Sequence, residues 1–408
     1  MGSNKKEHVL IGAGKLGRGY LADLFNKAGY HLIFMEYSKD LVEAMREQGY
    51  YTLFQEKEDG TGTNVVKIDG YEVYCTEGEE YDICVDKLVN ATTASIHTYD
   101  DGFKPIGHML GDAMKKRVAA GIEAPLDIFL VANYLNLDEA FRAYMFERLT
   151  TDEERQYVID KVGLIQTLPY RGGYPASEAM LKQDPIAVSA TDYPELPVDE
   201  EAFKGPIPEG INFLMLDRMS DRLNCKLWTA NVRGGVLAAI AKQAGYETIE
   251  EANKDEYAVK CSTFGWKEAY WGAMRHFNFT EEEFKRGARK DSKVYGRTTS
   301  DTVDRQLFGL KRKLGRQERL TGPALACLEF DRVPYFLTKG LAMAFQFDNP
   351  ADPTSVEVLE FVKTEGIEKA IETYCQLDLE NPLDQKLYQL VLAQYYDAFS
   401  VDPFALNY

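Results

Sequence analysis

The chain is poor in the features that mark membrane, secreted and metal-binding proteins. None of its 408 residues falls in an apolar run long enough to cross a membrane, and the N-terminal MGSNKKEH has no apolar signal-peptide core. Its six cysteines form no C-x-x-C pair, and its five histidines are scattered. This spacing offers neither a disulfide framework nor a metal-ligand cluster. We therefore expect a cytoplasmic protein with reduced thiols and no metal.

Positive charge is also scarce. The chain has 47 Lys and Arg against 65 Asp and Glu, a formal net charge of −18. Such a balance repels nucleic acid and anionic membrane, so we expect a small-molecule substrate and neither of those partners. The length predicts two domains and leaves the choice between a monomer and a small homo-oligomer open.

A glycine-rich turn near the N-terminus is the most informative pattern that is present. Gly12, Gly14 and Gly17 form G-x-G-x-x-G directly after a short apolar run. The first glycine of such a motif allows a tight turn, the second lets the backbone approach a pyrophosphate, and the third lets the following helix pack closely. The helix N-terminus then faces the anion. We expect this turn, with Lys15 and Leu16 between its glycines, to bind a dinucleotide.

An acidic residue stands where the ribose of such a cofactor would lie. A second apolar run ends in Glu36, about 20 residues beyond the last glycine, as this motif requires. A carboxylate there repels a 2′-phosphate, which favours NAD over NADP, although Lys39 weakens that preference. The alternative is a plain glycine turn with Glu36 in solvent, which leaves the third glycine and the spacing unexplained.

Strand and helix patterns alternate through the first half of the chain. Residues 50–75 alternate at period two, which predicts an antiparallel excursion inserted in the nucleotide-binding fold. We expect a strand around residues 87–91. Small hydroxylic residues after a parallel strand lie where such sheets bind ligands, so we expect cofactor contacts from Thr92, Thr93 and Ala94. A plain strand-to-helix turn is the alternative.

A change of composition marks the end of the first half. A further buried strand at 126–133 completes the pattern of a doubly wound, Rossmann-type α/β sheet. Proline, glycine and acidic residues then crowd together between about 168 and 210, and helical periodicity dominates beyond them. We predict an NAD-binding Rossmann-type domain at 1–204 and a mostly α-helical substrate and catalytic domain at 205–408.

One helix of the second half combines polar groups with an apolar stripe. In residues 216–235, apolar side chains recur at three- and four-residue steps. At about 100° per residue, Lys226 and Asn231 lie on opposite shoulders of this stripe, and Gly234 falls near its middle. A lysine in such a place often extends its amine to solvent, so the pattern alone leaves its role open.

Together, GAGKLGRG, Glu36, NATTAS and K-x4-N at 226–231 resemble the polyol-specific long-chain dehydrogenases of the mannitol dehydrogenase family. The resemblance runs along nearly the whole chain and includes DTVDR at 301–305 and RKLGRQERLTGPAL at 312–325. It implies an NAD- or NADP-dependent, metal-independent oxidoreductase that interconverts a polyol and a ketose, or their phosphates, and Glu36 favours NAD. Mannitol 1-phosphate with fructose 6-phosphate is the first pair to test.

The resemblance also implies two catalytic roles. Lys226 would be the general base that takes the proton of a secondary alcohol while hydride leaves for the nicotinamide. Asn231 would hydrogen-bond the oxygen as alkoxide character develops. The amine must be neutral for this, so its pKa must fall by about two or three units, which burial near other cations can achieve.

Several positions depart from the family pattern, which continues K-x4-N-x2-H. Gly234 stands in place of the histidine, and Asn133 begins Asn-Tyr where a Glu-Asn pair is expected. Where the family has the acidic stretch D-S-x-V-D-R, this chain has QTLPYR, which keeps only Arg171. Where the family has R-F-x-N, this chain has KVYG, which begins at Lys293. Because substrate positions have changed together, two alternatives stay open: a catalytically impaired sensor of NAD(H) or a sugar phosphate, and a dehydrogenase for a different sugar or sugar acid.

The remaining substrate candidates are basic. Arg233, beside the glycine, is positioned either to hold an anionic group or to lie in solvent. Arginines bind phosphate in bidentate fashion, so Arg316 and Arg319 in the basic stretch LKRKLGRQERL are candidates for a sugar phosphate. A solvated helix face interrupted by Glu318 is the alternative.

Overall fold

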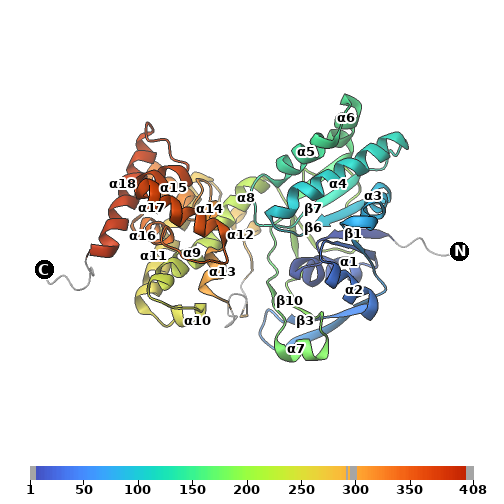
Figure 1. Ribbon diagram of the computed structural model, residues 1–408, viewed down its shortest axis with the longest axis horizontal. Helices are drawn as coiled ribbons and strands as arrows, with labels where there is room; N and C mark the ends of the chain where they lie inside the picture. The colour runs from blue at the N-terminus through green and yellow to red at the C-terminus, as the bar shows by residue number, and fades with distance from the viewer. Residues whose placement is uncertain (1–5, 291–292, 295–300, 401–408) are drawn as a thin grey trace. The chain divides into compact units, whose positions relative to one another are not determined.

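The computed structural model of the chain describes residues 6–290, 293–294 and 301–400. Two compact units make up the chain: Met1–Ser220 with Arg289–Arg297, and Asp221–Ala288 with Thr298–Tyr408. Figure 1 shows how the elements follow one another along the chain. The division falls after Ser220, further along the chain than the predicted boundary, and a short segment near residue 290 belongs to the first unit.

The first unit is built on a six-stranded sheet in which all neighbouring strands are parallel. The strand order is β5-β2-β1-β6-β7-β8. The strands are β1 (Glu7–Ile11), β2 (His31–Glu36), β5 (Glu72–Cys75), β6 (Thr93–Ile96), β7 (Leu126–Leu130) and β8 (Val162–Gln166). The order reverses between β1 and β6, the point at which doubly wound sheets bind ligands. The predicted Rossmann-type sheet is confirmed.

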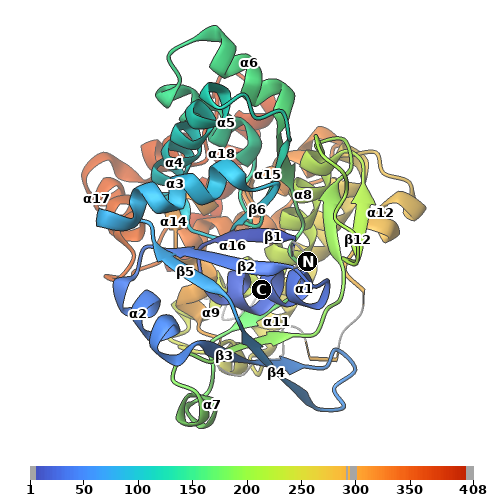
Figure 2. The ribbon, with the colours of Figure 1, turned by 90° about the vertical axis from the view of Figure 1, so that its right-hand side faces the viewer.

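Helices cover both faces of this sheet. One apolar core holds side chains of α3 (Tyr81–Asn90), α4 (Asp100–Ala119), α5 (Leu137–Arg148) and α6 (Asp152–Lys161). The other holds side chains of η1 (Gly17–Leu21), α1 (Ala22–Lys27) and α2 (Lys39–Gln48). In Figure 2, α3 and α4 lie on one side of β1 and β2, and α1 lies on the other. Burial on both faces explains why these strands read as continuous apolar runs.

The predicted antiparallel excursion forms most of a second sheet. β3 (Tyr50–Glu56) and β4 (Thr63–Asp69) pair antiparallel, and β10 (Val188–Thr191) and β9 (Gly173–Tyr174) extend them. α7 (Glu178–Gln183) connects the last two. A third, two-stranded sheet pairs β11 (Leu196–Asp199) with β12 (Phe213–Leu216). The end of the predicted excursion instead forms β5, at the edge of the parallel sheet.

One predicted strand is wrong. Residues 87–90 are the last turn of α3, and the strand that follows is β6. Cys84, Val85 and Leu88 are buried at helical spacing against the sheet. A short apolar run of this kind cannot be told from a buried strand by periodicity alone.

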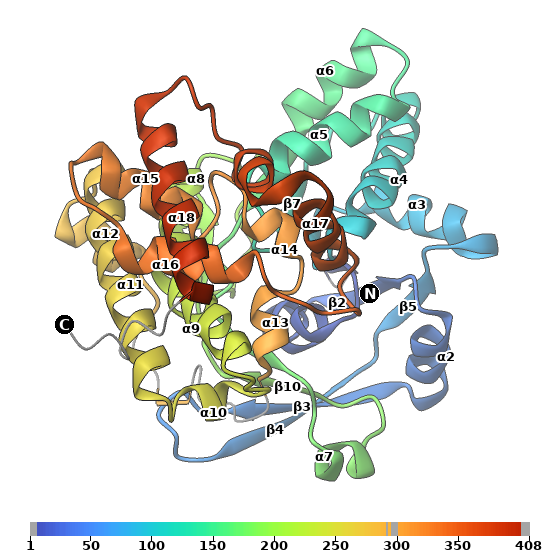
Figure 3. The same ribbon diagram turned by 60° about the vertical axis from the view of Figure 1, so that its left-hand side comes forward.

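The second unit is mostly α-helical, as predicted. Its apolar core holds side chains of α9 (Val232–Gln243), α11 (Glu256–His276), α15 (Thr321–Glu329), α16 (Tyr335–Ala344), α17 (Pro353–Tyr374) and α18 (Pro382–Ser400). α9 packs on α11, α16 and the short α13 (Val303–Leu307) (Figure 3). The other short helices are α10 (Ile249–Ala252), α12 (Glu281–Gly287) and α14 (Leu310–Lys313). Within the described ranges, no helix is long and apolar enough to span a membrane.

Candidate functional site

The three glycines of the turn after β1 have different steric surroundings. Gly12 has φ +96°, a left-handed conformation, and a Cβ there would lie 2.6 Å from the His97 carbonyl oxygen. A Cβ on Gly17 would lie 2.1 Å from the Gly12 carbonyl oxygen. A Cβ on Gly14 would meet nothing within 4 Å. Packing therefore requires the first and third glycines, whereas the second leaves its backbone open to a ligand.

These features fit a dinucleotide. Gly14 and Lys15 are exposed, and the helix begins at Lys15, with the Arg18 N–H donating to the Gly14 carbonyl at 3.0 Å. The amino end of this helical segment is thus open to an anion such as a pyrophosphate.

Glu36 joins the end of β2 to the turn. Its Oε2 accepts a hydrogen bond from the Ala13 N–H at 2.7 Å, and its Oε1 accepts one from the Ser38 N–H at 3.0 Å. The side chain is buried beside the turn. A carboxylate has about four acceptor sites, so both oxygens retain capacity for ribose hydroxyls.

His97 lies at the carboxyl edge of the parallel sheet, beside the glycine turn, and was not predicted from the sequence. It directly follows β6; its N–H donates to the Ile11 carbonyl at 2.9 Å, and its Nδ1 lies 3.1 Å from the Gly12 carbonyl oxygen. A carbonyl can only accept, so Nδ1 carries the proton. Burial lowers the pKa of His97 to about 4, so the imidazole is neutral. Its place directly after the segment TASI at 93–96, where the apolar Ile96 is followed by a polar residue, is the signal that could have identified it.

Thr92, Thr93 and Ala94 lie at the opposite end of β6. Thr93 Oγ1 donates to the Glu7 carbonyl at 3.2 Å, at the amino end of the neighbouring β1. Their predicted place beside the cofactor turn is therefore wrong, because the strand begins later than expected. Asn133, by contrast, follows β7 and is half-buried at the carboxyl edge of the sheet.

Arg171 does not reach toward a substrate. Only 3% of it is exposed, and its Nη1 donates to Asp23 Oδ2 at 2.7 Å. Nη1 also donates to the Gly19 carbonyl, while Nε and Nη2 donate to the Tyr193 carbonyl at 3.0 and 2.9 Å. Arg171 therefore links the segment around Tyr193 to η1 and α1. Its predicted contact with substrate is wrong, because these partners occupy the guanidinium group.

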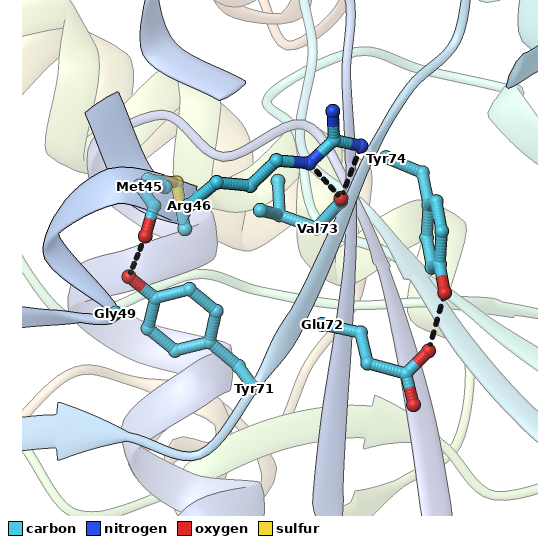
Figure 4. A pocket seen from close by; sticks show the side chains of 7 residues that line it. All are labelled: Met45, Arg46, Gly49, Tyr71, Glu72, Val73 and Tyr74. Carbon is cyan, nitrogen blue, oxygen red and sulfur yellow. Dashed lines mark hydrogen bonds between the residues drawn. The ribbon is translucent and has the colours of Figure 1, made fainter. Parts of the chain in front are cut away.

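Two other features of the first unit lie apart from the glycine turn. The Lys293 N–H donates to the Glu58 carbonyl at 2.8 Å, beside the β3–β4 connection. A depression of about 410 Å³ is lined by residues at the carboxyl end of α2 and by residues 71–74, in and just before β5 (Figure 4). Its polar groups pair with one another: Tyr71 donates to the Met45 carbonyl, and Arg46 to the Val73 carbonyl. The cofactor turn faces the carboxyl ends of the strands instead.

In the second unit, a π-helical turn interrupts the predicted catalytic helix. α8 (Met219–Lys226) runs into η3 (Leu227–Asn231), and α9 follows. A π turn bonds residue i to residue i+5, so a residue five positions on lies one turn further along the same face. Lys226 and Asn231 therefore share a face. The predicted placement on opposite shoulders is wrong, because it assumed regular α-helical spacing.

Gly234 of α9 extends this face, since it lies three positions after Asn231 and residues three apart are neighbours on a helix surface. We call the surface of Lys226, Asn231 and Gly234 the Lys226 face. Lys226 is 7% exposed and Asn231 is half-buried. Single π turns inside α-helices occur frequently at functional sites.

A buried tryptophan anchors the π turn. Trp228 Nε1 donates to the Gln317 carbonyl at 2.8 Å, and its ring packs against Gly322 of α15, where a Cβ would lie 2.5 Å from the indole. Thr229 Oγ1 donates to the Cys225 carbonyl at 2.7 Å within the helix. Tertiary packing thus fixes the turn that brings Lys226 and Asn231 together.

The gap predicted at Gly234 is filled. A Cβ on Gly234 would lie 2.7 Å from Gln306 Oε1, and one on Gly235 would lie 3.4 Å from Arg319 Cδ. The helix continues through both glycines to Gln243. The two glycines therefore allow close approach of other side chains and do not end the helix.

The arginines predicted to bind substrate lie in different environments. Arg316 pairs with Asp384 of α18, with Nη2 2.9 Å from Oδ1, which contradicts a free phosphate-binding role. Arg319 is 6% exposed, and its Nε lies 3.3 Å from Glu318 Oε2. Arg233 is exposed on α9. In the part of the chain that the structure describes, no group of three or more His, Cys, Asp or Glu side chains is arranged to hold a metal ion.

A parallel sheet of this order with a glycine turn at its switch point is the fold of nucleotide-dependent dehydrogenases. The chain matches the mannitol dehydrogenase Rossmann domain over residues 6–210 and belongs to that family. It is an oxidoreductase that acts on a CH–OH group of a small molecule, with a nucleotide cofactor.

Similar proteins cover nearly the whole chain. The mannitol-1-phosphate 5-dehydrogenase of Anoxybacillus flavithermus is 25% identical over 92% of this chain and 96% of its own length. The enzyme of the same name from Bacillus licheniformis is 25% identical over 94% of this chain and 98% of its own. The crystal structure of a D-sorbitol dehydrogenase in substrate-free form has a TM-score of 0.70 at 16% identity, covering 95% of this chain and 93% of that one. This last likeness shows the shared fold.

Proposed function

We propose that this protein is an NAD-dependent dehydrogenase that interconverts a polyol phosphate and a ketose phosphate, mannitol 1-phosphate and fructose 6-phosphate being the first pair to test. The observation that carries the proposal is the π turn, which places a buried lysine and an asparagine on one face of a helix. The names of the similar enzymes support the substrate pair.

Residues of the first unit would hold the cofactor. The turn from Gly12 to Gly17 would bind the pyrophosphate, and Glu36 would accept hydrogen bonds from the ribose hydroxyls. The negative charge of Glu36 favours NAD over NADP, because a 2′-phosphate would lie beside it. When bound, the nicotinamide supplies the acceptor, or in the other direction the donor, of the hydride.

Residues of the second unit would handle the proton. A neutral Lys226 takes the proton of the secondary hydroxyl as the hydride leaves the same carbon. Asn231 donates its side-chain N–H to that oxygen and stabilises the developing negative charge. In the reducing direction the charged Lys226 returns the proton to the carbonyl oxygen.

The test is to follow the oxidation of NADH with a panel of ketoses, ketose phosphates and keto acids. We expect turnover with at least one ketose or ketose phosphate, and weaker activity with NADPH. If no member of the panel oxidises NADH, the proposal fails.

A second candidate function is a sensor that binds NAD(H) or a sugar phosphate without turnover. Gly234, a residue without a side chain on the Lys226 face, favours it. The sensor predicts saturable NADH binding, measured by fluorescence titration, with no oxidation on any substrate. Wild-type turnover at ordinary enzyme rates would exclude it.

A further inference from the structure

The Lys226 face has a position without a side chain, and a residue from another helix occupies the space above it. Gln306 lies on α13, which packs against α9 (Figure 3). Its Oε1 lies 2.7 Å from the position that a Cβ of Gly234 would take. Gly234 and Asn231 are neighbours on the helix surface, so this oxygen lies over the Gly234 end of the Lys226 face.

The orientation of the Gln306 amide follows from its partners. Its Nε2 donates to Asp301 Oδ2 at 2.7 Å, and Arg305 Nη2 donates to the same carboxylate oxygen at 2.5 Å. An ionised carboxylate can only accept, so the NH2 group must face Asp301 and the carbonyl oxygen must face Gly234. The amide is held with its acceptor toward the Lys226 face.

The backbone around Gln306 is also fixed. Lys313, which is 7% exposed, donates its Nζ to the Gln306 carbonyl at 2.8 Å. Thr302 caps α13 by accepting a hydrogen bond from the Arg305 N–H at 3.2 Å. The side chain is half-buried, and within the described residues no group donates to its Oε1. The oxygen is thus both held in place and available to a ligand.

We infer that Gln306 is a substrate-binding residue, whose Oε1 accepts a hydrogen bond from the hydroxyl on the carbon next to the reacting carbon. The inference rests on the proposed function, because polyols and ketoses carry such a hydroxyl. Asn231 donates to the reacting oxygen and Gln306 accepts from its neighbour, so the pair together would select α-hydroxy ketones over simple ketones. Gly234 is required because any side chain there would displace the amide.

The experiment compares kcat/KM for a substrate and for its deoxy analogue that lacks the hydroxyl next to the carbonyl. Gln306→Met keeps the length of the side chain and removes the acceptor. We expect it to lower kcat/KM about tenfold for the hydroxylated substrate, the value of one hydrogen bond, and to leave the deoxy analogue unchanged. NADH affinity should stay at the wild-type value, and the melting temperature should fall only by the loss of the part-buried hydrogen bond to Asp301.

Gly234→Ala is the second variant, because its methyl group would push the amide away without altering Gln306 itself. It should show the same selective loss. Gln243→Met on the same helix, at an exposed position, is the matched control and should leave both substrates unaffected. An equal loss on both substrates, or no loss in either test variant, would overturn the inference. Absence of any wild-type turnover would instead overturn the proposed function, and with it this inference.

Discussion

The two units each place a π turn at a proposed functional segment, and the two turns are completed in different ways. η1 follows the glycine turn of the first unit, and the groups around it are close in sequence apart from Glu36 and His97. η3 lies in the second unit, and its face is completed by Gln306, which is far along the chain. A cofactor turn is thus a nearly local structure, whereas the proposed catalytic face is assembled by tertiary packing.

The largest expected effect comes from Lys226→Ala in the second unit. General acid–base assistance is typically worth about 10² to 10⁴ in rate, so kcat at saturating cofactor should fall by that factor. NADH affinity should remain unchanged, because the first unit holds the cofactor. Stopped-flow turnover and NADH titration measure the two. Lys254→Ala, at an exposed position, is the control; full kcat in Lys226→Ala would mean that another group transfers the proton.

A pair of glycine substitutions compares packing with binding in the first unit. Gly17→Ala would place a methyl group against the Gly12 carbonyl, and we expect a loss of about 3 kcal/mol in unfolding free energy with no NADH binding. Gly14→Ala has open space, so its unfolding free energy should stay near wild type while NADH binding weakens. Urea unfolding and NADH titration decide; a Gly17→Ala protein of wild-type stability would contradict the steric argument.

The two units should differ in the pH dependence of their stability. In the first, burial alone would raise the pKa of Asp23, but the nearby Arg171 and Lys27 lower it below its ordinary value. Its contribution is complete above the unfolded pKa, near 3.8, and is lost as pH falls through the folded pKa. Asp23→Asn should remove this loss at low pH.

In the second unit, Glu268 gives the stability a pH dependence of the opposite sign. Burial raises the pKa of Glu268 to about 7, and hydrogen bonds from the Leu337 and Phe336 N–H groups, at 3.0 Å, offset only part of this. The contribution of Glu268 to the free energy of unfolding is complete below the unfolded pKa, near 4.5. It falls by about 2–3 kcal/mol as pH rises through about 7. Calorimetry between pH 2 and 9 measures the low-pH loss from Asp23 and the high-pH loss from Glu268, and Glu268→Gln should remove the high-pH loss. Identical profiles for Glu268→Gln and wild type would refute the assignment.

The smallest effect concerns Glu36. Glu36→Ala should weaken NADH binding about tenfold, roughly 1.4 kcal/mol, through loss of hydrogen bonds to the turn and the ribose. The kcat at saturating NADH should be spared, the reverse of Lys226→Ala. Steady-state kinetics over a wide NADH range separates the two parameters. A Glu36→Ala protein with unchanged KM for NADH would place the ribose elsewhere.

Features that depend on residues close together in the chain could be predicted from the amino-acid sequence. The glycine spacing, the strand before it and the carboxylate of Glu36 predicted the cofactor turn, because the left-handed φ of Gly12 and the contact of Gly17 with the Gly12 carbonyl arise within the turn itself. Parallel strands buried on both faces read as apolar runs, so the doubly wound sheet was predictable as well. The position of β6 was not, because the last turn of α3 has the same apolar character as a strand.

The arrangement of the proposed catalytic face depends on packing between distant segments and could not be predicted from the sequence. The π turn depends on the anchoring of Trp228 against Gly322, and no local spacing shows it. Arg171 and Arg316 are indistinguishable from ligand-binding arginines in sequence, but buried carboxylates from distant segments, Asp23 and Asp384, pair with them. Gln306 reaches Gly234 from another helix. Such contacts join residues far apart in the chain, so the pattern of either segment alone carries no signal of them.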